Sequence, residues 1–347
     1  MSIPFVHCTD LYHPPQDPDD HFDLAIVMAL PELDLHGVIL DATKRFLERS
    51  PQGVDIPRDP GVVPVTQLNY LTARSIPFAV GPTQPLMRVD DTVCDRLKSE
   101  QAGVELLSKI LETSQEPVTI SIVGSARVVA AAYNRNPELM HRKTKAILLN
   151  AGANAFGQNE WNVGLDRFAF IQLWRSGLPI FWYPCATENG AFDENHPNST
   201  HWSATHEELL HDISPRLRAW FCYALSGSSR GDIIHALDEL GKGAVWEHLL
   251  PAKRHLWSTA SLVMAAGRIL ARTNAGWRFV LKEDPSILEE WPFSMENISP
   301  SVNDVGEVTW KLTDYRTNYK LFHRRQGSGY RQAMAEALNA LFQTYKF

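Results

Sequence analysis

The chain has 347 residues, of which 44% are hydrophobic and ten are Trp, enough apolar material for one large globular core or two smaller ones. A net charge of −7 and a pI near 6.0 exclude the strongly basic face that binds nucleic acid or an anionic membrane. Without an apolar run of membrane-spanning length or a signal peptide, we expect a soluble, cytoplasmic protein.

Short runs rich in Val, Ile and Leu recur through the first half of the chain. They cover residues 4–8, 36–40, 76–80, 118–123, 145–149 and 179–184. Continuous apolarity is typical of strands buried on both faces, so we predict an α/β fold with a doubly wound, mostly parallel sheet flanked by helices. Later segments look helical at 207–211, 215–226, 255–273 and 329–345, with one β segment at 308–312. We expect one domain, with an α/β core over 1–206 and a mainly helical part over 207–347 packed on it.

The junction between the first strand and the first helix is unusually acidic. Its carboxylates are Asp10, Asp17, Asp19, Asp20 and Asp23. Carboxylates this dense repel one another unless a positive charge lies among them, which favours a hard divalent cation bound through oxygen. The alternative is that one acid caps the helix and the others are solvated, but one cap needs only one acid.

A second polar cluster follows the Gly-rich turn at 150–154. It contains Glu160, Asn162 and Asp166 on a loop that enters a helix. A carboxylate accepts hydrogen bonds and an amide both donates and accepts, so such a loop can hold vicinal hydroxyl groups. An alternative role for Asp166 is to cap the helix predicted at 167–175.

These motifs together resemble the inosine-uridine-preferring nucleoside hydrolase family, which has a doubly wound fold and a tightly bound calcium. The family's opening Asp-x-Asp-Pro-Gly-x-Asp-Asp is similar to Asp10 followed by Asp19-Asp20-His21-Phe22-Asp23. Its Ala-Glu-Phe-Asn-x-x-x-Asp-Pro is similar to Glu160-Trp161-Asn162-Val163-Gly164-Leu165-Asp166, and its Gly-Pro-Leu-Thr-Asn turn to Gly124-Ser125-Ala126-Arg127-Val128. The similarity covers about residues 4–185 and recurs near His255.

The resemblance implies hydrolysis of the N-glycosidic bond of a nucleoside or a related ribosyl compound, with Ca²⁺ as cofactor. Asp10 would bind the metal and act as base toward a metal-bound water. Asp20 and the backbone carbonyl of Arg127 would be further ligands, and His255 would be the acid for the leaving group. The implied substrate-binding residues are Asp19, Asn154, Glu160 and Asn162.

The chain also departs from the family pattern. Eight residues separate Asp10 from Asp19 where the family has three, and the family's early Gly-Asn is replaced at Asp41. Leu256 stands where the family has its last metal carboxylate, and leucine cannot bind calcium. Either Asp17 and water, or Ser258 or Thr259, would then complete the coordination shell of the metal. The alternative is that the chain binds metal weakly.

Residues 187–206 have no counterpart in the family pattern. The segment follows a strand end and contains His196, His201, Trp202 and His206. We expect it to form one wall of the pocket, with His201 as a second candidate acid and Trp202 as a base-stacking aromatic. The alternatives are a surface loop folded away from the sheet and, less favoured, a transition-metal site.

Three functions therefore compete. The leading one is a metal-dependent N-ribosyl hydrolase acting on a small-molecule nucleoside, with no nucleic-acid or membrane partner and a possible homo-oligomeric state. The second is a non-catalytic nucleoside-binding or ribose-binding protein that kept the fold but lost part of the metal site, which Leu256 favours. A metal-dependent phosphatase is disfavoured, because no Ser/Thr–Lys pair lies at the strand ends.

Overall fold

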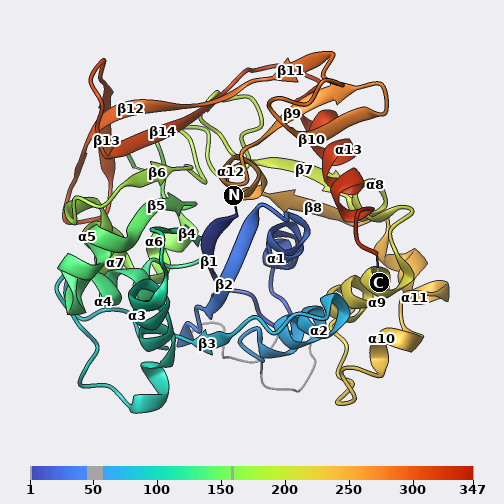
Figure 1. The fold of residues 1–347 in the computed structure, drawn as a ribbon, viewed down its shortest axis with the longest axis horizontal. Coiled ribbons are helices and arrows are strands. Elements are labelled where there is room, and N and C mark those ends of the chain that lie inside the picture. Colours follow the sequence, from blue (N-terminus) through green and yellow to red (C-terminus); the bar gives the residue numbers. More distant parts are fainter. Residues whose placement is uncertain (1, 45–57, 158–159, 347) are drawn as a thin grey trace.

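A nine-stranded sheet runs through the centre of the molecule (Figure 1), in the computed structural model that describes residues 2–44, 58–157 and 160–346. The strand order is β13-β12-β14-β6-β5-β4-β1-β2-β3. From β14 to β3 all neighbours are parallel, whereas β12 is antiparallel to β13 and β14. The strands are β1 (Ile3–Thr9), β2 (Leu33–Leu40), β3 (Phe78–Val80), β4 (Val118–Ile122), β5 (Thr144–Leu149), β6 (Ile180–Trp182), β12 (Phe293–Val302), β13 (Val308–Leu312) and β14 (Tyr319–Arg324). The predicted doubly wound, mostly parallel α/β fold is confirmed.

The central strand β1 shows why its sequence is apolar without alternation. Phe5 belongs to the hydrophobic core on one face of the sheet and Val6 to the core on the other. Because successive side chains of a strand point to opposite faces, a continuous apolar run fills both cores. The first core includes side chains of α1 (Asp19–Ala29), α2 (Val62–Thr72), α9 (Pro215–Leu225), α12 (Thr259–Ala265) and α13 (Tyr330–Phe342). The second includes those of α3 (Ala102–Thr113), α4 (Arg127–Arg135), α5 (Pro137–Lys143) and α7 (Arg167–Arg175).

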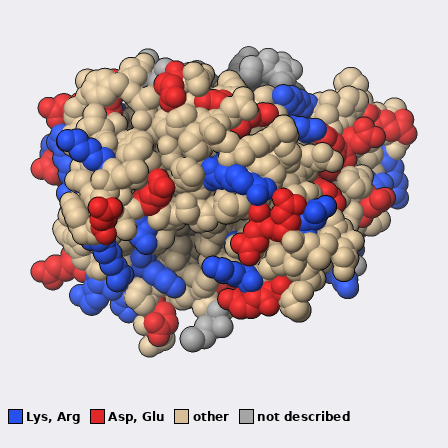
Figure 2. Space-filling model, turned by 90° about the horizontal axis from the view of Figure 1, so that it is seen from above, with Lys and Arg blue, Asp and Glu red and all other residues tan. Residues whose placement is uncertain are grey.

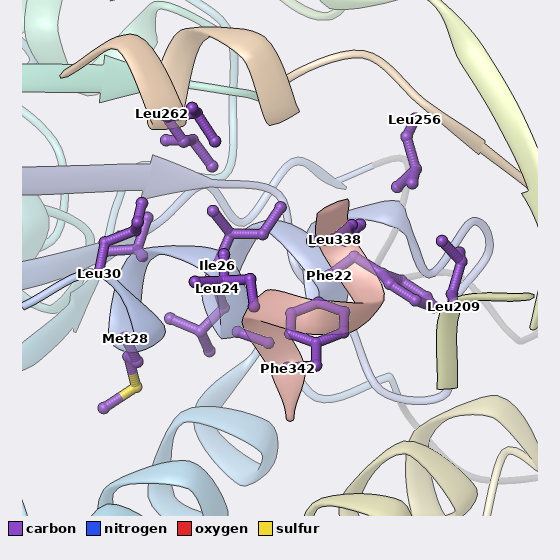
Figure 3. Close-up of a cluster of buried hydrophobic side chains, with 14 of the residues drawn as sticks. Phe22, Leu24, Ile26, Met28, Leu30, Leu209, Leu256, Leu262, Leu338 and Phe342 are labelled. Atoms are coloured by element: carbon purple, nitrogen blue, oxygen red, sulfur yellow. The ribbon is translucent and has the colours of Figure 1, made fainter. Parts of the chain in front are cut away.

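Helix α1 is buried along almost its whole length, because other elements surround it. Figure 3 shows its labelled side chains among those of later segments, which are Leu209, Leu256, Leu262, Leu338 and Phe342. Beyond α13, the Tyr345 hydroxyl donates a 2.6 Å hydrogen bond to the Ala25 carbonyl. The helix that carries Asp19 and Asp20 is thus fixed by the end of the chain.

Residues 207–347 contain strands as well as the expected helices. After α8 (His206–Leu210), α10 (Ala236–Glu239) and α11 (Gly243–Leu249), the chain forms β9 (Arg268–Thr273), β10 (Gly276–Leu281) and β11 (Glu289–Trp291) as a separate antiparallel sheet. β12, β13 and β14 then extend the central sheet. The helix expected over 255–273 is shorter, because Gly267 adopts a left-handed φ of 73° after α12 and starts a new strand.

Two further short strands lie outside both sheets. β7 (Trp202–Thr205) and β8 (Lys253–Leu256) pair antiparallel, with Ser203 opposite His255. The pair brings the segment after β6 next to the segment before α12. Residues far apart in the sequence therefore meet beside the central sheet.

The described surface carries both signs of charge. Acidic and basic side chains are both spread over the face shown in Figure 2. Among the described residues, no helix has the length and apolarity needed to cross a membrane.

The described part of the chain also contains two further short helices, η2 (Lys98–Glu100) and α6 (Trp161–Leu165).

Candidate functional site

A cavity of about 410 Å³ lies at the carboxyl ends of the parallel strands. Asp10 follows β1, Val123 follows β4, Asn150 follows β5, and Cys185 lies three residues beyond β6. The residues that line it are Asp10, Tyr12, Gln16, Asp17, Asp19, Asp20, Val123, Asn150, Glu160, Trp161, Asn162, Cys185, Ala191, Phe192, Trp257 and Ser258. Open α/β sheets bind their ligands at this edge, so the cavity is the candidate site.

The carboxyl groups of Asp10, Asp19 and Asp20 form the floor of the cavity. The side chains of the partly buried Asp10 and the buried Asp20 lie close enough to share a proton, and the Thr9 hydroxyl donates to Asp20. Burial raises the pKa of both well above the usual aspartate range, and the charge of Asp41 raises that of Asp10 further. Two such carboxyl groups can approach this closely only with a shared proton or with a cation between them.

The donors around this pair suit a hard cation better than a transition metal. Asn150 lines the cavity, and its Oδ1 is buried with no hydrogen-bond partner among the described residues. Carboxylate and neutral oxygens are the donors that hard cations accept, and both kinds line the cavity. Within residues 2–44, 58–157 and 160–346, however, no three His, Cys, Asp or Glu side chains converge on one metal position, so the acidic motif is not assembled into a complete carboxylate site.

Arg127 lies away from the cavity. Its side chain is fully buried, with Nε donating to Asp166 at 2.9 Å, Nη1 donating to the Pro82 carbonyl at 2.8 Å, and Nη1 lying 3.8 Å from Asp41. Since Arg127 is the first residue of α4 and does not line the cavity, the structure does not bring it to the Asp10–Asp20 pair as expected. Val123, at the end of the preceding strand, lines the cavity there instead.

Glu160 and Asn162 line the cavity together, and much of their bonding capacity is used locally. Glu160 caps α6 and accepts hydrogen bonds from the backbone amides of Gly152, Asn162 and Val163. The Asn162 amide group donates to the carbonyls of Val123 and Asn150. These contacts tie the loop to the ends of β4 and β5. Asp166 caps α7, as its alternative role required, and is paired with Arg127.

The segment 187–206 does supply a wall of the cavity, through residues that sequence reasoning missed. Ala191 and Phe192 line the cavity, and Trp257 lies beside Phe192 with ring centroids 5.8 Å apart. The Trp257 Nε1 donates to the Ala191 carbonyl at 2.9 Å, which fixes the two segments together. The position of Trp257 just after the expected acid His255 is the one signal that could have found it.

His201 and His255 meet behind this wall. His201 Nε2 lies 3.0 Å from His255 Nδ1, and the Phe192 ring centroid lies 5.4 Å from that of His201 and 4.8 Å from that of His255. Burial lowers the pKa of His201 to about 3 and also lowers that of His255, so both are neutral at pH 7. Neither lines the cavity directly, and Phe192 separates them from it.

Two expected substrate-binding residues lie elsewhere. Trp202 is fully buried in the core, where its Nε1 donates to the Thr259 hydroxyl at 3.3 Å. Asn154 does not line the cavity, and its amide donates to Asn198 at 3.3 Å. Trp257 and Asn150, which follow β8 and β5, are an aromatic and a carboxamide side chain that do line the cavity.

The long loop between Asp10 and Asp19 is packed rather than solvated at its start. The Tyr12 hydroxyl donates to the Asp41 carbonyl at 3.1 Å, and His13 pairs with Asp59 through two backbone hydrogen bonds. Further on, Asp17 forms an ion pair with Arg254 on β8. The extra residues thus add Tyr12, Gln16 and Asp17 to the cavity lining.

The chain is similar in sequence to pyrimidine-specific ribonucleoside hydrolases named RihA. It is 30% identical to that of Enterobacter sp. (strain 638) and 29% identical to that of Citrobacter koseri, each over 201 residues. Each match covers 52% of this chain and 59% of the relative, so the chain matches about three fifths of their length. No family model matches the chain.

In structure, the chain is similar to a plant nucleoside hydrolase, the PpNRh1 enzyme, with a TM-score of 0.54 and 16% identity over 99% of this chain and 100% of that one. It is also similar to a purine-preferring ribonucleoside hydrolase from Gardnerella vaginalis, with a TM-score of 0.52 and 13% identity over 98% and 99% of the two chains. At this identity the structural likeness concerns the fold. Together with the sequence matches, it confirms the resemblance drawn from the motifs.

Proposed function

We propose that this chain, a divergent relative of the nucleoside hydrolases, is a metal-dependent N-ribosyl hydrolase that cleaves the N-glycosidic bond of a nucleoside or a related ribosyl compound. The observation that carries the proposal is one cavity lined by the neighbouring carboxyl groups of Asp10 and Asp20 and also by Asp19, Asn162 and aromatic rings. Carboxylates suit a ribosyl cation and aromatic rings suit a base, so one cavity offers both halves of a nucleoside complementary contacts.

Asp10 is the proposed catalytic base. A bound divalent cation, calcium in our proposal, would lower the pKa of a coordinated water. Asp10 would accept a proton from the attacking water as the oxygen of that water bonds to the anomeric carbon of the ribose. The C–N bond breaks at the same carbon through an oxocarbenium-like state, and the electron pair leaves with the base. The charge of Asp10 and Asp20 stabilises the ribosyl cation.

The remaining residues of the site orient and release the substrate. Asp19 and Asn162 would hydrogen-bond the ribose hydroxyls, with Glu160 holding their loop in place. Phe192 and Trp257 would stack on the base. His255, hydrogen-bonded to His201, is the candidate proton donor for a poor leaving base. Since it is neutral at pH 7 with a lowered pKa, it would first have to take up a proton, and Phe192 would have to move to open the way to it.

A second candidate is a protein that binds nucleosides without cleaving them. Leu256 favours it, because this side chain is fully buried in the apolar core where the family has a metal carboxylate. A cavity with a weakened cation site would keep the ribose and base contacts. Hydrolysis and binding are therefore to be measured side by side.

The test is release of reducing sugar from a panel of purine and pyrimidine nucleosides, with calcium and with chelator, for the wild type and Asp10→Asn. We expect the wild type to release reducing sugar with calcium but not with chelator, and we expect Asp10→Asn to lose this release. Saturable nucleoside binding by calorimetry without any sugar release would reject the hydrolase and support the binding protein.

A further inference from the structure

The late carboxylate that the family pattern places at position 256 has no substitute on β8. Leu256 ends that strand, is fully buried and lies in the apolar cluster around α1 (Figure 3). Its side chain does not line the cavity. Any replacement for the missing negative charge must therefore come from another element.

Asp23 is such an acid, and neither the family pattern nor the proposed mechanism uses it. It lies on α1 one turn beyond Asp19 and Asp20, so the three acids share one side of the helix. Its side chain is 2% exposed, and its Oδ1 has no hydrogen-bond partner among the described residues. The Ser258 side chain lies within reach of this carboxyl group and favours its charged form, and Ser258 lines the cavity.

A buried carboxylate with an unsatisfied oxygen is unfavourable on its own. Removing such a group from water costs several kcal/mol, about what a nearby cation can return. Asn150 provides an independent sign of the same kind, since this residue lines the cavity and its buried Oδ1 has no hydrogen-bond partner among the described residues. Two residues, Asn150 at the cavity and Asp23 beside Ser258, thus each leave one buried oxygen atom unsatisfied.

We propose that Asp23 and Ser258 together replace the missing carboxylate: the Ser258 hydroxyl oxygen contacts the cation, and Asp23 accepts the hydrogen bond of that hydroxyl. Accepting this hydrogen bond turns the lone pairs of Ser258 toward the cavity and adds negative charge behind them. Asp23 is therefore a positioning residue. The inference rests on the proposed cation site and adds to it the residues that complete the site.

The experiment is calorimetric titration of calcium chloride into the chelator-treated full chain. The proteins are the wild type, Asp23→Asn, Ser258→Ala and the double variant. Asp34→Asn, an exposed acid on β2, is the matched control and should bind as the wild type does. We expect Asp23→Asn and Ser258→Ala each to weaken binding about 10–100-fold, the usual effect of losing an outer-shell partner. The double variant should be no weaker than the weaker single one, since both remove the same contact.

Thermal unfolding separates this role from a merely structural one. In chelator, Asp23→Asn should melt no lower than the wild type, because it removes a buried charge, whereas its stabilisation by calcium should shrink. A lower melting temperature in chelator with unchanged calcium affinity would make Asp23 structural and overturn the inference.

The two proposals fail in different ways. If the wild type binds calcium and Asp23→Asn binds it equally well, the inference is wrong while calcium-dependent sugar release can still stand. If the wild type binds no calcium, both the inference and the metal part of the proposed function are rejected. If calcium binding follows the expected pattern without sugar release, the cation site stands and only the hydrolase is rejected.

Discussion

The carboxylate floor of the cavity, made of Asp10, Asp19 and Asp20, and its aromatic wall, made of Phe192 and Trp257, are built in opposite ways. The floor comes from the end of β1 and the start of α1, both deep in the core. The wall comes from two loops, and Phe192 is 63% exposed. In the proposed function, the chemistry would therefore sit on rigid elements, whereas the contacts to the base would sit on loops that can change without disturbing the fold.

The comparison predicts the largest loss of activity for the floor. Asp10→Asn should lower nucleoside hydrolysis by about 10²–10⁴-fold, because it removes the proposed base and a cation ligand. Its melting temperature in chelator should not fall, since one buried charge is gone. Reducing-sugar release measures the loss, and a variant that keeps more than about a tenth of the wild-type rate contradicts the assigned role.

The buried Arg127–Asp166 ion pair, which lies away from the cavity, should have a large effect on the free energy of unfolding. Arg127→Met leaves Asp166 without its only ion-pair partner among the described residues, which typically costs about 3–5 kcal/mol of unfolding free energy. Urea unfolding measures this change. Arg175→Met is the matched control, because Arg175 pairs with the exposed Asp304 and should cost less than about 1 kcal/mol. Equal losses of unfolding free energy in Arg127→Met and Arg175→Met would show that the buried Arg127–Asp166 pair stabilises the fold no more than an exposed pair does.

Substitutions in the aromatic wall should mainly weaken the affinity for the substrate. Trp257→Ala should raise the KM for a nucleoside about tenfold and change kcat less, because stacking on a base is worth about 1–3 kcal/mol. Trp257→Phe keeps an aromatic face and should recover most of the affinity. A selective loss of kcat with unchanged KM would place Trp257 in the chemistry and break the division between floor and wall.

The smallest predicted effect concerns His201 behind the wall. Its pKa is lowered to about 3 by burial, whereas an unfolded histidine titrates near 6.5, so the unfolded chain binds more protons between these values. His201 therefore lowers stability as the pH falls below about 6.5, by at most about 1.4 kcal/mol per pH unit. His201→Gln should flatten the fall between pH 6.5 and 5 in urea unfolding. An unchanged slope would show that His201 does not contribute.

The floor could be predicted from the sequence because strand ends fix it. Once Asp10 closes an apolar run and Asp19 and Asp20 open an apolar helix, the parallel sheet places them at one edge. The wall could not be predicted in the same way. Phe192 and Trp257 meet only because β7 pairs with β8, and such a pairing between short distant strands leaves little periodicity in the sequence.

Arg127 shows a second limit of sequence reasoning. A motif match places a backbone segment, but a shift of a few residues changes which residue lies at the cavity. Here Val123, directly after β4, lines the cavity, whereas Arg127, four positions later, already begins α4. The Arg127 guanidinium pairs instead with Asp166, which lies 39 residues further along the chain. No motif spacing in the sequence predicts this pair.

The hydrogen bond from Tyr345 to Ala25 spans 320 positions of sequence and has a consequence for biosynthesis. Chains emerge from the ribosome N-terminus first. Helix α1 therefore lacks the cover of Leu338, Phe342 and Tyr345 until α13 and the residues after it have been synthesised. A nascent chain cannot fix the acidic start of α1 at the cavity before α13 has docked.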